Sequence, residues 1–356
     1  MPNVVKNFED LLLQVVKEGA SDLHITVGRH PILRIDGELV PLVKFDLVTP
    51  DMASSFVSAI LNDREQERFL QEKELDLSYN FQDLVRFRVN MFHQRGYQTA
   101  ALRVIPTKIR TFEELSLPPI LADFTEKKQG FFLVVGPTGH GKSTTLAAMI
   151  DHMNHRRTEH IITVEDPIEY LFTSDKAVIV QREVGVDTLD FHKALRSMFR
   201  EDIDVAMIGE MRDAETIATA VTAAETGHFV LSTLHTNNAA QTVDRIIDSF
   251  PPAQQAQIRA QLASTLIGIV SQRLIPRISG GLIPAVEILV STPAVRTVIR
   301  ENKTHELDMI IETGLEHGMI NLNRYLVDLV KRGEISIGNA VLYSLRPEEI
   351  GTLLGQ

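Results

Sequence analysis

The feature that most constrains the fold of this chain is a nine-residue loop that follows an apolar run at 131–135. Its sequence is Gly136-Pro137-Thr138-Gly139-His140-Gly141-Lys142-Ser143-Thr144. The loop matches the pattern G-x-x-x-x-G-K-[ST], whose glycines allow successive backbone N–H groups to point at a phosphate. Such a loop works between a buried strand and the N-terminus of a helix, where the helix dipole adds to the attraction for anions. We therefore expect a strand at 131–135, buried on both faces, and a helix that begins near Lys142.

Three further apolar runs have the same character and also end in polar residues. The runs are Ile161–Val164, Val205–Ile208 and Phe229–Leu234, and the residues that follow them are Glu165-Asp166-Pro167, Gly209-Glu210-Met211-Arg212 and His235-Thr236-Asn237. This alternation of strands and helices predicts an α/β fold with a mostly parallel sheet and helices on both faces. Ligands of such sheets bind beyond the carboxyl ends of the strands, so we expect the four polar clusters to lie together.

An alanine-rich segment separates the last two of these runs. Residues 214–226 have the composition of a helix, with Asp213 as its N-cap and Gly227 as its stop. The segment therefore supplies one of the connecting helices that a parallel sheet requires.

The loop predicts that the chain binds ATP together with Mg²⁺. Lys142 would neutralise phosphate charge, and the Ser143 hydroxyl would bind the metal ion. His140 is expected only to tolerate the turn. The residues expected to contact the nucleotide are Gly136, Thr138, Gly139, His140, Gly141, Lys142, Ser143 and Thr144. A glycine-rich turn that binds no nucleotide is the alternative, and the flanking strand and helix disfavour it.

Two carboxylates and a histidine stand at the ends of the other apolar runs. Glu165 and Glu210 occupy positions where an ionised group is costly unless a cation accompanies it. Hydrolysis of ATP needs one carboxylate to hold the magnesium shell and one to orient or deprotonate water. Either glutamate could instead cap a neighbouring helix. His235 could contact the terminal phosphate, or it could be a hydrogen-bonded structural histidine.

Residues 1–105 have the pattern of a small α+β domain. A first helix is expected to end near Gly19, a hairpin to turn at Asp36-Gly37, and a second helix to cover roughly residues 50–70. Two further strands, Arg86–His93 and Gln98–Ile105, are joined by a four-residue turn.

If that second hairpin is symmetric about its turn, Arg88 lies directly opposite Arg103. Two like charges facing each other in a sheet are destabilising unless an anion lies between them. A solvated arginine face with counterions is one explanation. The other is that the pair meets an anionic ligand.

The length of 356 residues suits two domains. Residues 106–119, with Pro118-Pro119 at the end, have the composition of an interdomain linker. We expect the nucleotide-binding domain to be 120–356, with an appended helical region from about residue 293.

Composition limits where the chain works and what it binds. It contains no run of apolar residues long enough for a transmembrane helix, no basic-then-apolar leader and no cysteine, so we expect a cytoplasmic protein without disulfides or a thiolate metal site. Its formal net charge of −11 disfavours nucleic acid as a partner, since phosphate binding needs clustered lysine and arginine.

Taken together, the motifs closely resemble those of the secretion-ATPase superfamily, which serves type II secretion and type IV pili. Gly136–Thr144 resembles the Walker A motif of that superfamily, and Ile161–Tyr170 resembles its aspartate box. Ile208–Asp213 resembles its Walker B motif, and Leu231–Asn237 resembles its histidine box. Ser21–Ile25 and Arg34–Gly37 resemble parts of its N-terminal domain. The resemblance extends over both expected domains.

Within that superfamily the sequence is most similar to the PilT-type retraction ATPases. The chain starts almost directly at the small N-terminal domain, and it lacks the four-cysteine zinc element that extension and secretion ATPases commonly carry. In addition, Ala294–Glu301 resembles the retraction family's Ala-Ile-Arg-Asn-Leu-Ile-Arg-Glu helix. Val295, Thr297 and Val298 depart from that pattern, which leaves room for an accessory retraction paralogue.

The resemblance implies a PAS-like N-terminal domain, a RecA-like P-loop ATPase domain and a C-terminal helical extension. It implies that Glu165 is the general base, that Glu210 is the metal-binding Walker B residue, and that Arg88 and Arg103 reach nucleotide bound at an adjoining domain. It also implies a homohexameric ring at the inner face of the cytoplasmic membrane, which rotates its domains on ATP turnover. The implied partners are an inner-membrane pilus platform protein and, for a paralogue, the main retraction ATPase.

Three other functions are compatible with parts of the sequence. An extension or secretion ATPase is disfavoured by the missing cysteine element, and a nucleic-acid translocase with a RecA-like core by the acidic charge. A non-enzymatic nucleotide-binding scaffold is disfavoured because every expected catalytic position is filled.

Overall fold

The structure, a computed structural model, describes residues 2–35, 37–82, 84–106 and 108–355, with side chains from Phe8 onward. The chain divides into two compact units, and the main division falls between Lys108 and Ile109. Of the segment proposed as a linker, the residues from Ile109 onward belong to the second unit, where Phe112 and Leu117 are buried.

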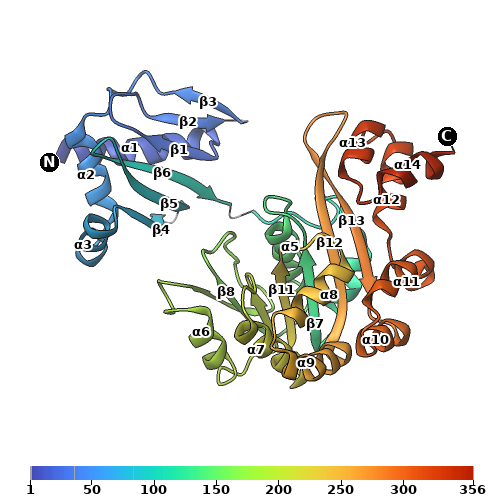
Figure 1. Ribbon diagram of the computed structural model, residues 1–356. Coiled ribbons are helices and arrows are strands. Elements are labelled where there is room, and N and C mark those ends of the chain that lie inside the picture. Colours follow the sequence, from blue (N-terminus) through green and yellow to red (C-terminus); the bar gives the residue numbers. More distant parts are fainter. Residues whose placement is uncertain (1, 36, 83, 107, 356) are drawn as a thin grey trace. The chain divides into compact units, whose positions relative to one another are not determined.

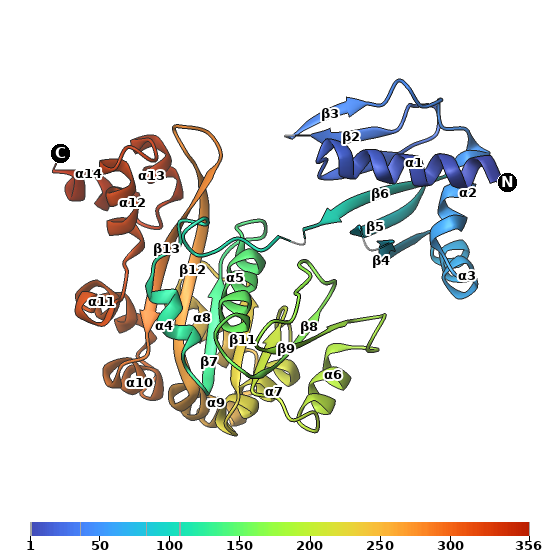
Figure 2. The same ribbon diagram turned by 180° about the vertical axis from the view of Figure 1, so that it is seen from behind.

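The first unit is built on an antiparallel sheet with the strand order β3-β2-β1-β6-β5-β4 (Figure 1). Its strands are β1 (Asp22–Ile25), β2 (Ile32–Ile35), β3 (Glu38–Pro41), β4 (Glu74–Phe81), β5 (Val85–Gln94) and β6 (Tyr97–Ile105). Its helices are α1 (Pro2–Glu18), α2 (Pro50–Ile60) and α3 (Asp63–Glu72). Phe8 of α1, Phe56 of α2 and Phe87 of β5 lie together in one core, which holds the helices to the sheet (Figure 2).

Several local expectations for this unit are confirmed. The first helix ends at Glu18 and is followed by Gly19 with φ 62°. The hairpin of β5 and β6 has the symmetric register, which pairs Arg88 directly with Arg103. In the first hairpin Ile35 pairs with Glu38, whereas Asp36 of its expected turn lies outside the described residues.

The expectation of one helix over roughly 50–70 is wrong, because the segment forms two helices. Leu61 is in extended conformation, and Asn62 starts the second helix with a capping box. The Asn62 side chain accepts a hydrogen bond from the Glu65 N–H, and the Glu65 carboxylate accepts one from the Asn62 N–H. Two otherwise unpaired backbone donors are satisfied in this way, which favours a new helix start over continuation.

The second unit contains a sheet with the strand order β13-β12-β7-β11-β10-β8-β9, in which β13 alone runs antiparallel to its neighbour. Its strands are β7 (Gly130–Val135), β8 (His160–Glu165), β9 (Val178–Glu183), β10 (Val205–Ile208), β11 (Phe229–Leu234), β12 (Leu266–Pro276) and β13 (Leu282–Val290). The expected mostly parallel α/β sheet is therefore confirmed, and all four apolar runs are strands within it.

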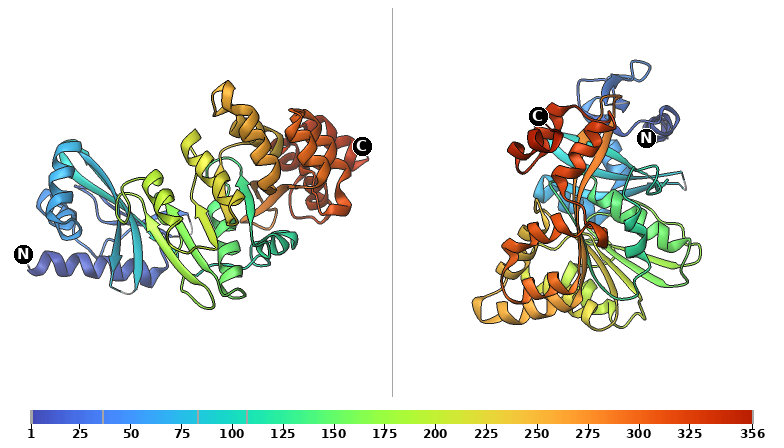
Figure 3. Two further views of the ribbon diagram at one scale, coloured as in Figure 1. Left: turned by 90° about the horizontal axis from the view of Figure 1, so that it is seen from below. Right: turned by 90° about the vertical axis from the view of Figure 1, so that its right-hand side faces the viewer.

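Helices cover both faces of this sheet, which the right-hand view of Figure 3 shows nearly edge-on. Its helices are α4 (Ile120–Thr125), α5 (Lys142–Asn154), α6 (Phe191–Met198), α7 (Ala214–Glu225), α8 (Ala239–Asp248) and α9 (Pro252–Thr265). Alternate residues of β7 belong to different cores. Phe131 and Leu133 lie in one core with residues of helices α6, α7, α8 and α9, whereas Phe132 and Val134 lie in another core with residues of α4 and α5. Burial on both faces explains why the strand sequences are continuously apolar.

The helical pattern expected from about residue 293 is present. The elements are α10 (Pro293–Arg300), the 3₁₀ turn Thr304–Glu306, α11 (Leu307–Thr313), the 3₁₀ turn Leu315–His317, α12 (Leu322–Lys331), α13 (Ile337–Tyr343) and α14 (Pro347–Leu354). The last three helices have a core of their own, in which Leu326 and Ile350 pack with Ile275 of β12 and Ala285 of β13.

Strand β12 connects these C-terminal helices with the rest of the sheet. Its pairing with β7 shifts register between Leu266 and Gly268, as a β-bulge does. Beyond the bulge the Arg273 guanidinium donates a hydrogen bond to the Tyr343 carbonyl of α13, at 2.7 Å. The side chains of Gln272 and Leu274 lie beside the loop of residues 136–144 instead.

Candidate nucleotide-binding and catalytic site

The loop of residues 136–144 runs from the end of β7 into the first turn of α5, as expected. Gly136, Gly139 and Gly141 all have positive φ, between 79° and 145°. A Cβ atom on Gly136 would lie 2.3 Å from the Gln272 carbonyl oxygen, so glycine is required there by contact as well as by conformation. The loop thus packs closely on β12 while it opens toward the N-terminus of α5, which is a favourable place for an anion.

Lys142 is buried and reaches back across the loop. Its Nζ donates hydrogen bonds to the carbonyl oxygens of Gly136 and Pro137, both at 2.9 Å. The same Nζ lies 3.4 Å from Nδ1 of His235, at the end of β11. The cation is therefore held within the loop, where phosphate charge would need to be neutralised.

His140 corrects one expectation, since it does more than tolerate the turn. Its Nδ1 accepts a hydrogen bond from the Leu274 N–H at 2.9 Å, and its carbonyl oxygen accepts one from the Gln272 side chain at 2.8 Å. Burial, together with the nearby cations Arg273 and Lys142, lowers the pKa of His140 below its ordinary value. A neutral ring is the form that can accept at Nδ1, so this histidine attaches the loop to β12.

Glu165 is the last residue of β8, and its side chain is fixed by neighbours. The residue is 6% exposed. Thr163 donates a hydrogen bond to its carboxylate at 2.6 Å, and Gln181 donates another at 3.2 Å. These contacts orient the carboxylate at the strand end and do not cap a helix.

Glu210 follows β10 and is linked to His235. The Glu210 carboxylate forms an ion pair with Arg212 and lies 3.6 Å from Nε2 of His235. The other ring nitrogen of His235, Nδ1, lies 3.3 Å from the Thr138 hydroxyl of the loop. His235 thus lies between the loop and Glu210, which is a bridging position that its sequence context alone did not specify.

The strand ends that carry these side chains are joined by hydrogen bonds. Gly136 N–H donates to the Leu234 carbonyl at 3.3 Å, and Gly209 N–H donates to the Val164 carbonyl at 2.8 Å. The Thr233 hydroxyl donates to the Gly209 carbonyl at 2.7 Å. Because β7, β11, β10 and β8 are parallel neighbours, all four polar clusters lie at one edge of the sheet.

A cavity of about 390 Å³ adjoins the loop within the second unit. Leu115, Leu274 and Leu282 contribute apolar walls, Arg110 and Arg277 contribute cations, and Gly141, Thr144 and Thr145 form the side next to the loop. Its size and mixed lining suit the base and sugar of a nucleotide. The lining segments are far apart in the chain, so sequence patterns did not reveal this cavity.

Oxygen donors suitable for Mg²⁺ are available beside the loop. Within the described residues, no group of three or more histidine or acidic side chains is arranged to hold a metal ion by itself. Mg²⁺ in phosphoryl-transfer sites needs only one or two protein oxygens, because water and the substrate phosphates complete its shell. The Ser143 hydroxyl and the Glu210 carboxylate fit that requirement.

Arg88 and Arg103 belong to the first unit, whereas the edge described above belongs to the second. Asp22 pairs with Arg103 on the neighbouring strand, and its carboxylate accepts a hydrogen bond from Arg103 Nε at 2.8 Å. Burial alone would raise the pKa of Asp22, but hydrogen bonds from Arg103 and Ser21 outweigh that effect and hold it below its ordinary value. Asp22 therefore supplies an anion beside the arginine pair, which the sequence reasoning missed.

A further buried carboxylate contacts the start of α8, the helix that follows His235 in the chain. Glu287 of β13 is 6% exposed and accepts a hydrogen bond from the Ala239 N–H, the first of α8, at 2.8 Å. Burial raises the pKa of Glu287 to about 7, and Asp308 adds to the increase. The Ala239 N–H and the cations Arg273 and Arg346 offset part of it.

Comparison with known proteins agrees with this arrangement. The family described as type II/IV secretion system protein matches residues 2–281. The type IV pilus retraction ATPase PilT of Pseudomonas aeruginosa is 44% identical over 331 residues, which cover 93% of this chain and 96% of that protein. The type IV pilus ATPase PilU of the same organism is 40% identical over 338 residues, which cover 95% and 88%.

A solved structure is similar over nearly the whole chain. The crystal structure of the pilus retraction motor PilT with bound ADP superposes with a TM-score of 0.91 and 42% identity, and it covers 97% of this chain and 98% of that one. No helix in the described part of the chain is long and apolar enough to cross a membrane. The chain is thus an ATPase of the type II/IV secretion system protein family, and its resemblance to the PilT type, expected from the motifs, is confirmed.

Proposed function

We propose that this ATPase powers the retraction of type IV pili. The observation that carries the proposal is the similarity to the retraction ATPase PilT of P. aeruginosa, which extends over almost the full length of both chains. The structural similarity to the PilT motor with bound ADP supports it. The work done would be the removal of pilin subunits from the base of the fibre.

Hydrolysis in this proposal takes place at the carboxyl edge of the second sheet. The loop residues Gly139, Gly141, Lys142, Ser143 and Thr144 bind the phosphates of ATP, and the adjoining cavity receives the base and sugar. Glu165 accepts a proton from water as that water attacks the γ-phosphorus, and the bond from the γ-phosphorus to the β–γ bridging oxygen breaks. Mg²⁺, held by Ser143 and Glu210, would neutralise charge on the phosphates.

His235 would report the loss of the terminal phosphate. It contacts the loop through Nδ1 and lies near Glu210 through Nε2. Loss of the negative charge of the γ-phosphate from the loop would therefore act directly on His235 at the end of β11. The neighbouring strand ends would receive the change through their shared hydrogen bonds.

We further propose that the active form is a homohexameric ring, as the family resemblance implied. Arg88 and Arg103 would reach nucleotide bound at an adjoining domain and neutralise charge on the transferring phosphoryl group, an effect worth roughly 10³–10⁵ in rate in other NTPases. Phosphate release would weaken these contacts and let the two domains rotate about the boundary between Lys108 and Ile109. The ring would act in the cytoplasm, on a platform protein of the inner membrane.

The assignment of Glu165 is tested by the substitution Glu165→Gln. The variant is expected to bind ATP as the parent does and to hydrolyse it at least about 100-fold more slowly, because a positioned general base contributes about 10²–10⁴ in rate. Glu159→Gln is the matched control, since Glu159 precedes the same strand at its other end. Near-normal hydrolysis by Glu165→Gln would refute the general-base role.

The cellular function is tested by imaging pili in a deletion strain. Loss of a retraction motor is expected to leave abundant pili that do not retract, and complementation with a Lys142→Ala variant is expected to fail. Missing pili would point to an extension ATPase instead. DNA should not stimulate the purified ATPase, and stimulation would favour a nucleic-acid translocase.

An accessory retraction ATPase is the second candidate. The observation that favours it is the similarity to PilU over 95% of this chain. Retraction in a strain where this protein is the sole retraction ATPase separates the two candidates. An accessory protein would support no retraction alone, and it would require the main motor as its partner.

A further inference from the structure

Behind the phosphate-binding loop lies one buried amide side chain that contacts both the loop and the helix that follows it. Gln272 of β12 is 2% exposed. Its Nε2 donates a hydrogen bond to the His140 carbonyl at 2.8 Å, and its Oε1 accepts one from the Thr145 hydroxyl at 2.7 Å. We propose that Gln272 is a positioning residue, which holds the loop in the conformation that binds phosphate.

The first contact determines the direction of a backbone donor. The peptide unit that joins His140 to Gly141 is planar and trans, so its C=O and N–H point in opposite directions. Because Gln272 holds the His140 carbonyl on the side of β12, the Gly141 N–H points away from β12. That is the direction in which a loop of this kind presents its N–H groups to a phosphate.

The second contact fixes the first turn of α5 relative to the same strand. Thr145 is buried, and its hydroxyl is the donor to Gln272. One amide therefore holds the end of the loop and the start of the helix, whose N-terminal N–H groups form the rest of an anion site. A second hydrogen bond, from the Leu274 N–H to the His140 ring, supports the same arrangement.

The chemistry of the position favours an amide. An ionised glutamate could accept from Thr145 but could not donate to the His140 carbonyl, and a methionine of similar length has no donor and only a weak acceptor. The fit is also close, since a Cβ atom on Gly141 would lie 2.9 Å from Gln272 Nε2. A side chain at position 141 would therefore press on the amide that holds the loop.

This inference rests on the proposed binding of nucleotide phosphates by the loop, and the kinetic prediction follows from it. In a Gln272→Met variant the binding-competent loop becomes one of several conformations, so apparent affinity falls by the fraction that is competent. We expect the dissociation constant for ADP and the KM for ATP to rise together, by about tenfold for a loop that is competent one tenth of the time. The kcat should change less than about threefold, because saturating ATP restores the competent conformation.

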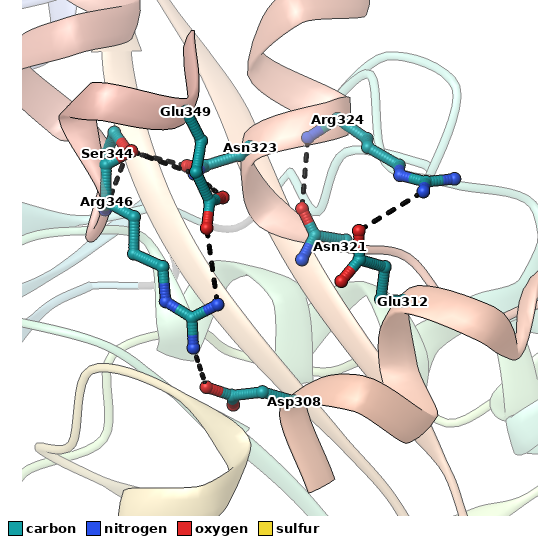
Figure 4. Close-up of polar contacts among 8 residues, drawn as sticks. All are labelled: Asp308, Glu312, Asn321, Asn323, Arg324, Ser344, Arg346 and Glu349. Atoms are coloured by element: carbon teal, nitrogen blue, oxygen red, sulfur yellow. Dashed lines mark hydrogen bonds and ion pairs between the residues drawn. The ribbon is translucent and has the colours of Figure 1, made fainter. Parts of the chain in front are cut away.

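The control is a buried amide among the C-terminal helices that has the same kind of bonding, with partners outside the loop. Asn323 of α12 donates to the Arg346 carbonyl and to the Glu349 carboxylate and accepts from the Ser344 hydroxyl (Figure 4). Asn323→Leu is expected to leave KM and ADP affinity unchanged. A general loss of folded protein would lower apparent kcat without moving KM, which distinguishes positioning from stability.

Further variants keep the test decisive if Gln272→Met folds poorly. Thr145→Val removes one of the two contacts and should raise KM, whereas Thr145→Ser keeps the hydroxyl and should restore it. The effects of Thr145→Val and Gln272→Met on KM should not add, because both substitutions remove the hydrogen bond between Thr145 and Gln272.

An unchanged KM and ADP affinity in both Gln272→Met and Thr145→Val would overturn the inference. Lys142→Ala tests the proposed function separately. If Lys142→Ala lowers ADP affinity while the Gln272 and Thr145 variants do not, only the positioning role fails. If Lys142→Ala binds ADP normally, the phosphate-binding role of the loop fails.

Discussion

Replacement of Glu287 by glutamine should change the way in which the stability of the second unit depends on pH. The substitution keeps the acceptor for the Ala239 N–H at the start of α8 and removes only the ionisable group. In the parent protein, folding removes this carboxyl group from water, where the charged form is best solvated, so burial disfavours the charged form. The variant has no such group to titrate.

The size of the effect follows from the pKa of Glu287, which is about 7 in the folded chain against an ordinary value of 4.5. Because the folded pKa is the higher one, the folded state binds more protons between these values, and stability is lost as pH rises through the folded pKa. At about 1.4 kcal/mol per pKa unit, the full loss is about 3 kcal/mol above pH 8. Of this, about 2 kcal/mol falls between pH 5.5 and pH 8.5.

Calorimetry of the full chain at these two pH values measures the effect. The transition of the second unit is identified as the one that ADP raises. At roughly 2–4 °C per kcal/mol for a unit of this size, the Tm advantage of Glu287→Gln should grow by roughly 4–8 °C from pH 5.5 to pH 8.5. Glu348→Gln, which removes the same charge at an exposed side chain of α14, should show no such growth. An advantage that is equal at both pH values would show that Glu287 titrates as it would in the unfolded chain.

Two other substitutions give measurable outcomes. Gly141→Ala places a Cβ atom 2.9 Å from Gln272 Nε2 at a residue whose φ is 80°. The backbone strain of roughly 1 kcal/mol and the close contact together should lower ADP affinity by at least about tenfold. An unchanged ADP affinity in titrations would contradict this. Asp22→Asn removes the anion beside the pair of Arg88 and Arg103. Hydrogen exchange in β1 and β6 should show that the free energy of opening falls by about 1 kcal/mol at pH 7. The expected loss is this small because Arg103 is 70% exposed and water screens the ion pair. The lowered pKa of Asp22 means that its stabilising effect disappears as pH falls through that value, so the two proteins should converge in acid, and a constant difference would exclude the ion pair as the cause.

Features that depend on neighbouring residues were predictable from the sequence. The phosphate loop, the four buried strands and the register of Arg88 with Arg103 follow from local patterns, because strand periodicity and turn length determine them. The break between α2 and α3 also had a local signal, the capping box of Asn62 and Glu65, which the apolar pattern obscured.

Features that depend on distant residues were not predictable in this way. Gln272 contacts His140 and Thr145, from which it is separated by more than a hundred positions, and nothing near it in the sequence marks that contact. Asp22 beside Arg103, 81 positions away, and the cavity lined by Arg110 and Leu282 likewise have no local mark in the sequence. Their proximity results from the order of strands in each sheet, which a single sequence does not specify.

The bulge in β12 has a consequence for insertions and deletions in this part of the chain. Successive strand side chains point to opposite faces, so the extra residue between Leu266 and Gly268 determines that Gln272 faces the loop and Arg273 faces Tyr343. Insertion or deletion of one residue between the bulge and Gln272 would reverse the faces of these two side chains. The Arg273 guanidinium would then face the loop, and the Gln272 amide would face the C-terminal helices. Natural length variation should therefore be absent from this stretch and accumulate instead in the β12–β13 turn, where Gly280 and Gly281 have open space around them.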